Sequence, residues 1–225
     1  MKLSIIIPVY NEEATLQDLL KRVEDVKLPV DKEIILVDDG SQDKSREIMH
    51  KLSHKCFFHE KNQGKGAAVR TGMQHATGDI IVIQDADLEY NPEDFKHMLE
   101  PILEGRTNVV FGSRFKHPAH KPRHLFYYLG NVALTLFTNI LFFSRVSDME
   151  TCYKMFKKEV LKDVPLRARS FDLEPELTAK ILKRGHTIVE VPIEYHSRPV
   201  EEGKKITWMD GVKAAWYLLK YRVKD

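Results

Sequence analysis

The sequence lacks the features that mark several specialised classes of protein. Its 225 residues contain only two cysteines, Cys56 and Cys152, too few for a disulfide framework and without partners at metal-ligand spacing. Buried thiols in a reducing compartment are the expected state of both. A formal net charge of +2 gives no nucleic-acid signal. No repeat or low-complexity tract occurs, and no signal peptide is expected, because Met1 leads directly into an apolar strand and a turn.

Long apolar runs are also scarce, and only residues 125–143 approach the length of a membrane span. Four polar residues interrupt that stretch, so a fully spanning helix is not expected: Asn131, Thr135, Thr138 and Asn139. The apolar residues follow a helical stripe, which consists of Leu125, Leu129, Val132, Leu136, Ile140 and Phe143. Two interpretations stay open for the stripe, namely packing in the core and contact with a membrane surface. The basic loop 115–123 before it suits anionic headgroups.

What the sequence does contain is a regular alternation of short apolar strands and helical segments. A hydrophobic content of 43% with 30% charged residues is that of an ordinary globular protein. The predicted strands cover 3–8, 33–37, 56–59, 80–83, 109–112, 152–156, 188–191 and 193–195. The predicted helices cover 12–26, 43–53, 67–75, 92–103, 174–184 and 208–222. This order predicts an α/β fold with a doubly wound, mostly parallel sheet, whose ligands bind at the carboxyl ends of the strands.

The strand at 80–83 runs directly into acidic residues. Asp85 and Asp87 are two positions apart in extended chain, so their side chains point the same way and can share one cation. Acids after a strand often cap the next helix instead, but Asn91 before Pro92 already fills that position. The pattern therefore favours a divalent metal with a diphosphate at this strand end.

Other polar clusters follow other strands. Asp38 and Asp39 are adjacent, so their side chains should point to opposite faces, one toward a base and one toward the helix above. We interpret His50, His54 and His59 as surface histidines, because no acids flank them at useful spacing.

The loop 64–66 is glycine-bearing but lacks the spacing of a Walker loop. We interpret this loop as the packed start of a helix, with Lys65 or Arg70 contacting the nucleotide region.

Five sequence blocks in order give the chain a resemblance to the family 2 glycosyltransferases, which use nucleotide sugars and have a GT-A fold. The blocks are Ile7–Glu12, Val37–Ser41, Gly64–Arg70, Asp85–Leu88 and Gly112–Arg114. Within the family the chain looks most like the synthases that load mannose or glucose onto a polyprenyl (dolichyl or undecaprenyl) phosphate. That likeness continues through Asp148 and the segments 191–197 and 198–205.

The resemblance implies a single GT-A domain over 1–225, with a nucleotide-sugar half at 1–114 and an acceptor or membrane-facing half with C-terminal helices at 115–225. It places base and ribose contacts on Pro8, Tyr10, Glu12, Val37 and Asp39. It places Mg²⁺ or Mn²⁺ on Asp85, Asp87 and Glu89, and basic groups over the donor on Arg198 and Lys205.

The acceptor decides which further residues the reaction needs. A lipid monophosphate is already ionised near pH 7 and needs positive charge, whereas a sugar hydroxyl needs a general base. Arg114, with Arg123 or His124 nearby, supplies the positive charge that a lipid monophosphate needs. Asp148 is a candidate base or orienting group, and a structural cap is the alternative.

The expected activity is an inverting transfer of mannose or glucose, from GDP-mannose or UDP-glucose, to polyprenyl phosphate at the cytoplasmic membrane face. The alternative acceptor is a hydroxyl of a lipid-linked sugar or cell-surface glycan. A peripheral membrane contact is expected, and nucleic acid is not an expected partner.

One departure bears on the donor. The mannose synthases carry a glycine-phenylalanine pair after the aspartate, whereas this chain has the segment 150–153, Glu-Thr-Cys-Tyr. The run at 64–70 looks more like the glucose branch, so the sequence leaves the donor sugar open.

Overall fold

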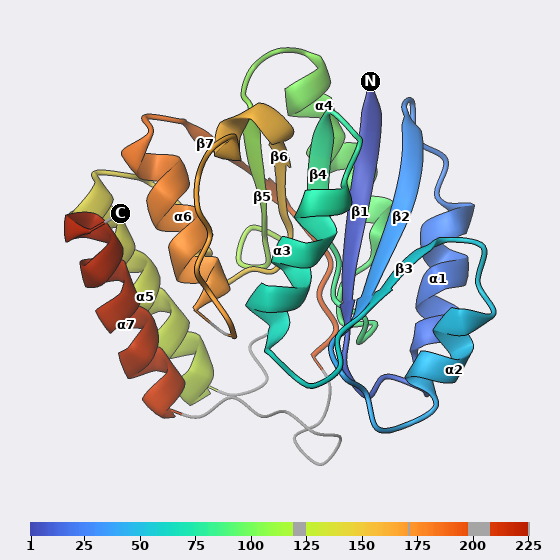
Figure 1. The fold of residues 1–225 in the computed structure, drawn as a ribbon. Helices are drawn as coiled ribbons and strands as arrows, with labels where there is room; N and C mark the ends of the chain where they lie inside the picture. The colour runs from blue at the N-terminus through green and yellow to red at the C-terminus, as the bar shows by residue number, and fades with distance from the viewer. Residues whose placement is uncertain (119–124, 171, 198–207, 225) are drawn as a thin grey trace.

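The computed structural model describes residues 1–118, 125–170, 172–197 and 208–224, and it shows one seven-stranded sheet with helices on both faces (Figure 1). The strands are β1 Lys2–Val9, β2 Asp31–Asp38, β3 Lys55–Phe58, β4 Ile80–Ile83, β5 Val109–Ser113, β6 Lys154–Lys157 and β7 Ile188–Pro192. The helices are α1 Leu16–Asp25, α2 Ser45–His50, α3 Lys65–His75, α4 Phe95–Leu103, α5 Leu125–Phe142, α6 Leu173–Lys183 and α7 Trp208–Val223. Two short 3-10 helices are η1 Pro92–Asp94 and η2 Lys158–Leu161.

The sheet has the order β3-β2-β1-β4-β6-β5-β7, and all neighbouring strands are parallel except at β6. β6 runs antiparallel to both β4 and β5, between which it is inserted. The predicted mostly parallel, doubly wound sheet is therefore confirmed. The apolar runs at the centre of β1, β2 and β4 are fully or almost fully buried, as expected of strands that are covered on both faces.

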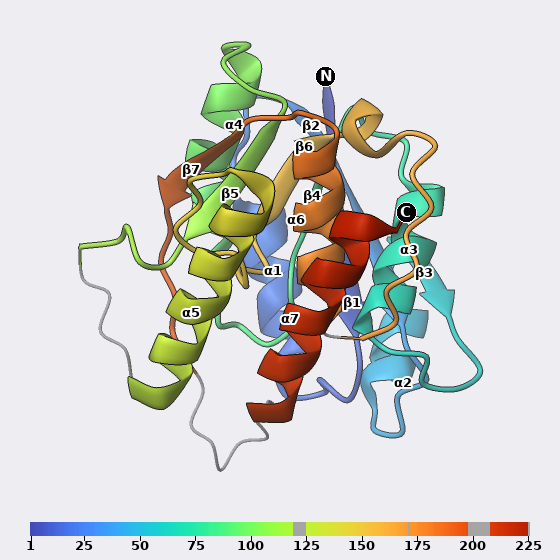
Figure 2. The ribbon, with the colours of Figure 1, turned by 90° about the vertical axis from the view of Figure 1, so that its left-hand side faces the viewer.

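Helices α3 and α4 lie on opposite faces of the sheet (Figure 2). The start of α3 is fixed by Gly64, which has a φ of +95° and so adopts a conformation that favours glycine. A Cβ on Gly64 would lie 2.0 Å from the carbonyl oxygen of Arg169, so the loop before α3 packs directly on that backbone. The predicted packing role of this loop is confirmed. Arg70 donates to the carbonyl of Leu166 at 3.3 Å.

Helices α5 and α7 pack against each other on one side of the molecule (Figure 2). The apolar stripe of α5 is exposed along its whole length, from Leu125 at 66% to Phe143, directly after the helix, at 87%. The polar residues face inward instead, and Thr135 and Thr138 are buried. Core packing, one of the two interpretations of this stripe, is therefore wrong.

Two smaller expectations also need revision. Cys152 is buried as expected, but Cys56 is only half-buried, and both thiols are free. His59 is not a surface histidine, because its side chain is 11% exposed and pairs with Asp39.

Within the described ranges, no helix combines the length and the apolar character that crossing a bilayer requires.

Candidate active site

The loops after β1 and β2 are tied to each other at the carboxyl edge of the sheet. The backbone N–H of Asn11 donates to Ser41 Oγ at 3.0 Å, and the backbone N–H of Glu12 donates to Ser45 Oγ at 2.8 Å. Asn11 adopts a left-handed conformation with a φ of 57°, which turns the chain sharply out of β1. Tyr10 and Glu12 are half-buried in this loop. The structure thus brings together the ends of the sequence blocks Ile7–Glu12 and Val37–Ser41.

The other base-contact candidates lie beside this pair of loops. Pro8 is half-buried, whereas Val37 is fully buried in the core, so Val37 can offer a ligand only its backbone. Asp38 and Asp39 turn to different partners, as adjacent residues in extended chain do. An oxygen of Asp38 lies 3.6 Å from Arg46 Nε of α2, whereas Asp39 faces the loop before α3.

The first charged centre of the site surrounds Lys65 at the start of α3. Its Nζ lies 2.8 Å from Asp85 Oδ1 and 2.9 Å from Glu174 Oε1 of α6, and it contacts Cys152 Sγ at 3.4 Å. Burial lowers the pKa of this amine, but the carboxylates of Asp85 and Glu174 more than offset that effect, and the net pKa is raised. Lys65 is therefore a fixed cation beside the first predicted metal ligand.

The three predicted metal ligands lie along the segment that follows β4. Asp87 Oδ1 accepts the backbone N–H of Glu89 at 3.1 Å, and Glu89 Oε2 accepts the hydroxyl of Tyr195 at 2.7 Å. Within the described part of the chain, no three acid, histidine or cysteine side chains converge as a ready-made metal cluster. Carboxylate oxygens are the donors that Mg²⁺ and Mn²⁺ prefer, and Mg²⁺ commonly uses one or two carboxylates together with substrate phosphates. The residues present fit that kind of site.

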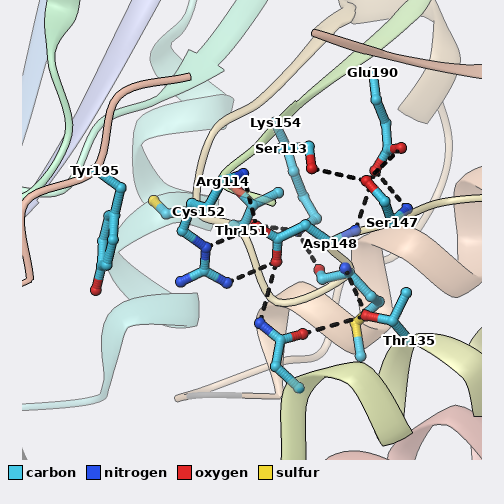
Figure 3. A network of polar contacts seen from close by, with 12 residues as sticks. Ser113, Arg114, Thr135, Ser147, Asp148, Thr151, Cys152, Lys154, Glu190 and Tyr195 are labelled. Atoms are coloured by element: carbon cyan, nitrogen blue, oxygen red, sulfur yellow. Dashed lines mark hydrogen bonds and ion pairs between the residues drawn. The ribbon is translucent and has the colours of Figure 1, made fainter. Parts of the chain in front are cut away.

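The second charged centre is the pair of Arg114, after β5, and Asp148 (Figure 3). Two parallel bonds of 2.7 Å join Arg114 Nε and Nη2 to Asp148 Oδ2 and Oδ1, and the backbone N–H of Arg114 adds a third at 3.0 Å. Asp148 is fully buried, which raises its pKa, but the arginine outweighs burial and the net pKa is lowered. The pair is therefore ionised and rigid.

The inward face of α5 supports this pair. Asn131 Nδ2 donates to Asp148 Oδ1 at 3.1 Å, and Thr135 Oγ1 accepts the backbone N–H of Met149 at 3.1 Å (Figure 3). From the other side, Glu190 of β7 accepts the backbone N–H groups of Ser147 and Asp148 at 2.7 and 3.1 Å. The polar residues that interrupt the apolar helix thus hold the loop that carries Asp148.

Tyr195 connects the acidic segment to this pair. Its hydroxyl donates to Glu89. The guanidinium carbon of Arg114 lies over its ring, 5.1 Å from the ring centroid, and Figure 3 shows the two side chains next to each other. Such stacking orients a guanidinium and leaves its N–H edge available. A continuous set of contacts therefore runs from the candidate metal ligands to Arg114.

Sequence reasoning missed two charged groups in the segment 150–154. Lys154 is fully buried between the carbonyls of Met149 and Thr151, and burial lowers its pKa. Glu150 is half-buried, its Oε1 has no hydrogen-bond partner among the described residues, and burial together with Glu174 raises its pKa to about 7. The departure from the mannose-synthase pattern at 150–153 was the sequence signal for Glu150.

Four other residues discussed from the sequence lie outside the described residues. They are Arg123, His124, Arg198 and Lys205.

The fold and the matching family model define the class of enzyme. A mostly parallel sheet, with candidate nucleotide contacts and acids at its carboxyl edge, is the GT-A architecture of glycosyltransferases that use nucleotide sugars. The model of the family described as glycosyl transferase family 2 matches residues 4–164. The chain belongs to family 2 of the glycosyltransferases.

Relatives and solved structures agree with this assignment. The chain is 30% identical over 217 residues to a dolichol-phosphate mannosyltransferase of Pyrococcus furiosus, a match that covers 91% of the chain and 59% of that protein. It is 30% identical over 244 residues to a UDP-N-acetylglucosamine–dolichyl-phosphate N-acetylglucosaminyltransferase of Methanococcus voltae, covering 97% and 95%. Glucosyl-3-phosphoglycerate synthase of Mycobacterium tuberculosis, solved with Mn²⁺, UDP and phosphoglyceric acid, shares the fold at a TM-score of 0.76 and 20% identity, covering 98% and 78%.

Proposed function

We propose that the protein transfers a hexose, mannose or glucose, from GDP-mannose or UDP-glucose to a polyprenyl phosphate, with inversion, at the cytoplasmic face of a membrane. The observation that carries the proposal is the geometry of Arg114. Among the residues that the structure describes, Asp148 takes two of the five guanidinium N–H groups of Arg114, which leaves three for a phosphate at the same sheet edge as Asp85 and Asp87. Curated relatives named for transfer to dolichyl and undecaprenyl phosphates support this acceptor class.

The donor occupies the ends of β1, β2 and β4 in this proposal. The base and ribose contact Pro8, Tyr10, Glu12, Val37 and Asp39. Lys65 provides positive charge for the diphosphate from its position between Asp85 and Glu174. Arg198 and Lys205, which lie outside the described residues, are proposed to contribute positive charge to donor binding.

A divalent cation completes the donor site. Asp85 and Asp87 would hold Mg²⁺ or Mn²⁺ together with the diphosphate oxygens, and Glu89 would add a further carboxylate. The bound ion supplies Lewis-acid neutralisation of the leaving diphosphate. The Mn²⁺ and Mg²⁺ in the solved glucosyl-3-phosphoglycerate synthases support the choice of metal.

The residues around Arg114 fit a phosphate nucleophile. A lipid monophosphate needs no proton removed to attack the anomeric carbon, so positive charge that positions it is sufficient. Asp148 would orient Arg114, because all its hydrogen bonds stabilise its ionised form and its lowered pKa makes it a weak base. In this role Arg114 contacts the acceptor phosphate, and Asp148 positions the guanidinium of Arg114.

The product identifies the acceptor. With radiolabelled GDP-mannose or UDP-glucose, Mn²⁺ and polyprenyl phosphate, the label is expected to move into a chloroform-soluble product that mild acid releases. Such lability is the property of a glycosyl phosphate, in which the phosphate leaves readily. Formation of only acid-stable product, or of none with either donor, would contradict the proposal.

A second candidate acceptor is a hydroxyl of a lipid-linked sugar or cell-surface glycan. The observation in its favour is Glu150, because a carboxyl group with a pKa of about 7 suits a general base. Glu150→Gln separates the two candidates within the same assay. Transfer to a hydroxyl would fall by about 10²-fold or more, whereas a phosphate acceptor does not need the base.

The exposed apolar side of α5 and α7 is the proposed membrane contact. We call it the α5/α7 surface, and its most exposed members are Leu125, Leu136, Ile140, Phe143, Val212, Trp216 and Val223. Exposed basic residues border it, namely Arg145, Lys213, Lys220 and Arg222. An apolar face with basic residues beside it is the pattern by which peripheral proteins bind anionic lipid.

Flotation with vesicles tests this surface. The protein is expected to float with vesicles that contain phosphatidylglycerol, and less with neutral vesicles. The double variant Leu136→Glu, Trp216→Glu should bind about 100-fold less tightly, since burying two large apolar side chains contributes roughly 3 kcal/mol or more. Leu103→Glu is the matched control, because Leu103 is exposed on α4 outside this surface. Equal binding by the double variant and the control would contradict the assignment.

A further inference from the structure

His59 lies directly behind Asp39, one of the residues proposed to contact the nucleotide. His59 Nδ1 is 2.7 Å from Asp39 Oδ1, and His59 Nε2 is 2.9 Å from Thr71 Oγ1 of α3. The side chains of His59 and Asp39 are 11% and 3% exposed, so water competes little for these bonds. The backbone N–H of His59 also donates to the carbonyl of Asp38 at 2.8 Å, which fixes the backbone from which the His59 side chain extends.

These partners determine the hydrogen positions on the imidazole ring. A carboxylate only accepts hydrogen bonds, so Nδ1 must carry the proton that faces Asp39. In the neutral ring Nε2 then accepts the hydroxyl hydrogen of Thr71. His59 is therefore a donor to Asp39, held in one orientation by a second partner on α3.

The same carboxylate receives two further donors from the loop before α3. The backbone N–H of Gln63 donates to Oδ1 at 3.0 Å, and that of Gly64 donates to Oδ2 at 2.7 Å. Each carboxylate oxygen can accept about two hydrogen bonds. Within the described part of the chain, His59 and Gln63 therefore fill Oδ1, and Oδ2 keeps one acceptor position.

We infer that His59 is a positioning residue for the donor nucleotide, because its Nδ1–H fixes Asp39 in the orientation that offers Oδ2 to an N–H group of the base. This inference rests on the proposed nucleotide-sugar donor. Uracil and guanine both carry a ring N–H beside a carbonyl, and either can donate to such an oxygen. Without the histidine, only the backbone N–H groups of Gln63 and Gly64 hold the carboxylate, so its orientation is less restricted and binding of the base includes part of the entropic cost of ordering it.

Two substitutions separate this role from a merely structural one. In His59→Asn the amide nitrogen can take the place of Nδ1 and donate to Asp39. In His59→Gln the amide reaches the place of Nε2, so it keeps the contact with Thr71 and loses the donor to Asp39. Both replace the ring by a neutral amide, and a general loss of packing should affect both.

Calorimetric titration with UDP and with GDP, each in the presence of Mn²⁺, measures the effect. For the nucleotide that the wild-type protein binds, the Kd is expected to rise about tenfold in His59→Gln and to stay within about threefold in His59→Asn. The KM for the sugar donor should rise in parallel in His59→Gln, with kcat nearly unchanged, because the lost interaction affects ground state and transition state alike. The titrations are carried out at temperatures below the thermal unfolding midpoints of both variants. A difference in Kd then does not come from unfolded protein.

Each outcome has a definite meaning. An equal loss of affinity in both variants, or none in His59→Gln, overturns the role of His59 while leaving the proposed function intact. If the wild-type protein binds neither UDP nor GDP, the proposed function is overturned, and this inference with it.

Discussion

Replacing Asp87 by asparagine is expected to lower kcat/KM for sugar transfer by about 10³-fold or more. The leaving diphosphate must be neutralised as the anomeric bond breaks, and preorganised charge of this kind contributes several kcal/mol to transition-state stabilisation. Asparagine has nearly the same shape as aspartate but no charge, so it weakens the binding of the divalent ion. Steady-state transfer rates at several Mn²⁺ concentrations measure the effect.

Two controls make this result specific. Asp18 is exposed on α1, far along the chain from the acidic segment, and Asp18→Asn should leave transfer within about twofold, as surface substitutions usually do. Added Mn²⁺ should restore part of the activity of Asp87→Asn only if the substitution acts through metal affinity. Full activity of Asp87→Asn at every Mn²⁺ concentration would contradict the metal assignment.

Replacing Arg114 by lysine is expected to lower transfer to polyprenyl phosphate by about 10²-fold or more. Lysine keeps one positive charge but cannot make the paired bonds to Asp148 and present further N–H groups to a phosphate. The lost orientation should reduce the rate at saturating donor, because the acceptor phosphate is the group that Arg114 positions. Transfer assays with varied polyprenyl phosphate measure this loss.

Donor binding provides the control for Arg114. The affinity for UDP or GDP with Mn²⁺ should change by less than about threefold in Arg114→Lys, since the nucleotide lies at the ends of other strands in the proposed function. Arg114→Met is expected to destabilise the protein by about 3–5 kcal/mol, because Asp148 would remain as a buried and unpaired charge. Thermal unfolding measures the difference in stability between Arg114→Met and Arg114→Lys. Loss of donor affinity in the stable Arg114→Lys variant would place Arg114 at the donor instead.

Local elements of the fold were predictable because they depend on short-range periodicity. The continuous apolar run of β4 and the segment of α6 that begins near Glu174 both appear where the sequence pattern indicated. The cap by Asn91 is also confirmed, since its side chain accepts the backbone N–H of Glu93 at 3.1 Å. Strand order was not predictable to the same degree, because nothing in the short segment of β6 shows that it inserts antiparallel between β4 and β5.

The apolar helix α5 shows a limit of pattern reasoning. Its amphipathic spacing was visible, but the same spacing describes a helix with its apolar side inward or outward. The structure decides the matter through Asn131 and Thr135, whose hydrogen bonds to the segment at Asp148 and Met149 require the polar side to face inward.

The sequence alone determined the alternation of strands and helices and the acids that follow β4, because these depend on neighbours a few residues apart. Only the tertiary structure decided which charged groups meet. Lys65 and Glu174 are 109 positions apart, and Arg114 and Asp148 are 34 apart, yet both pairs lie within hydrogen-bond distance. His59 and Asp39 are likewise separated along the chain and brought within hydrogen-bond distance only by the fold. Electrostatic and hydrogen-bond energies depend on distance and burial in space, which the packing of the whole sheet and its helices sets.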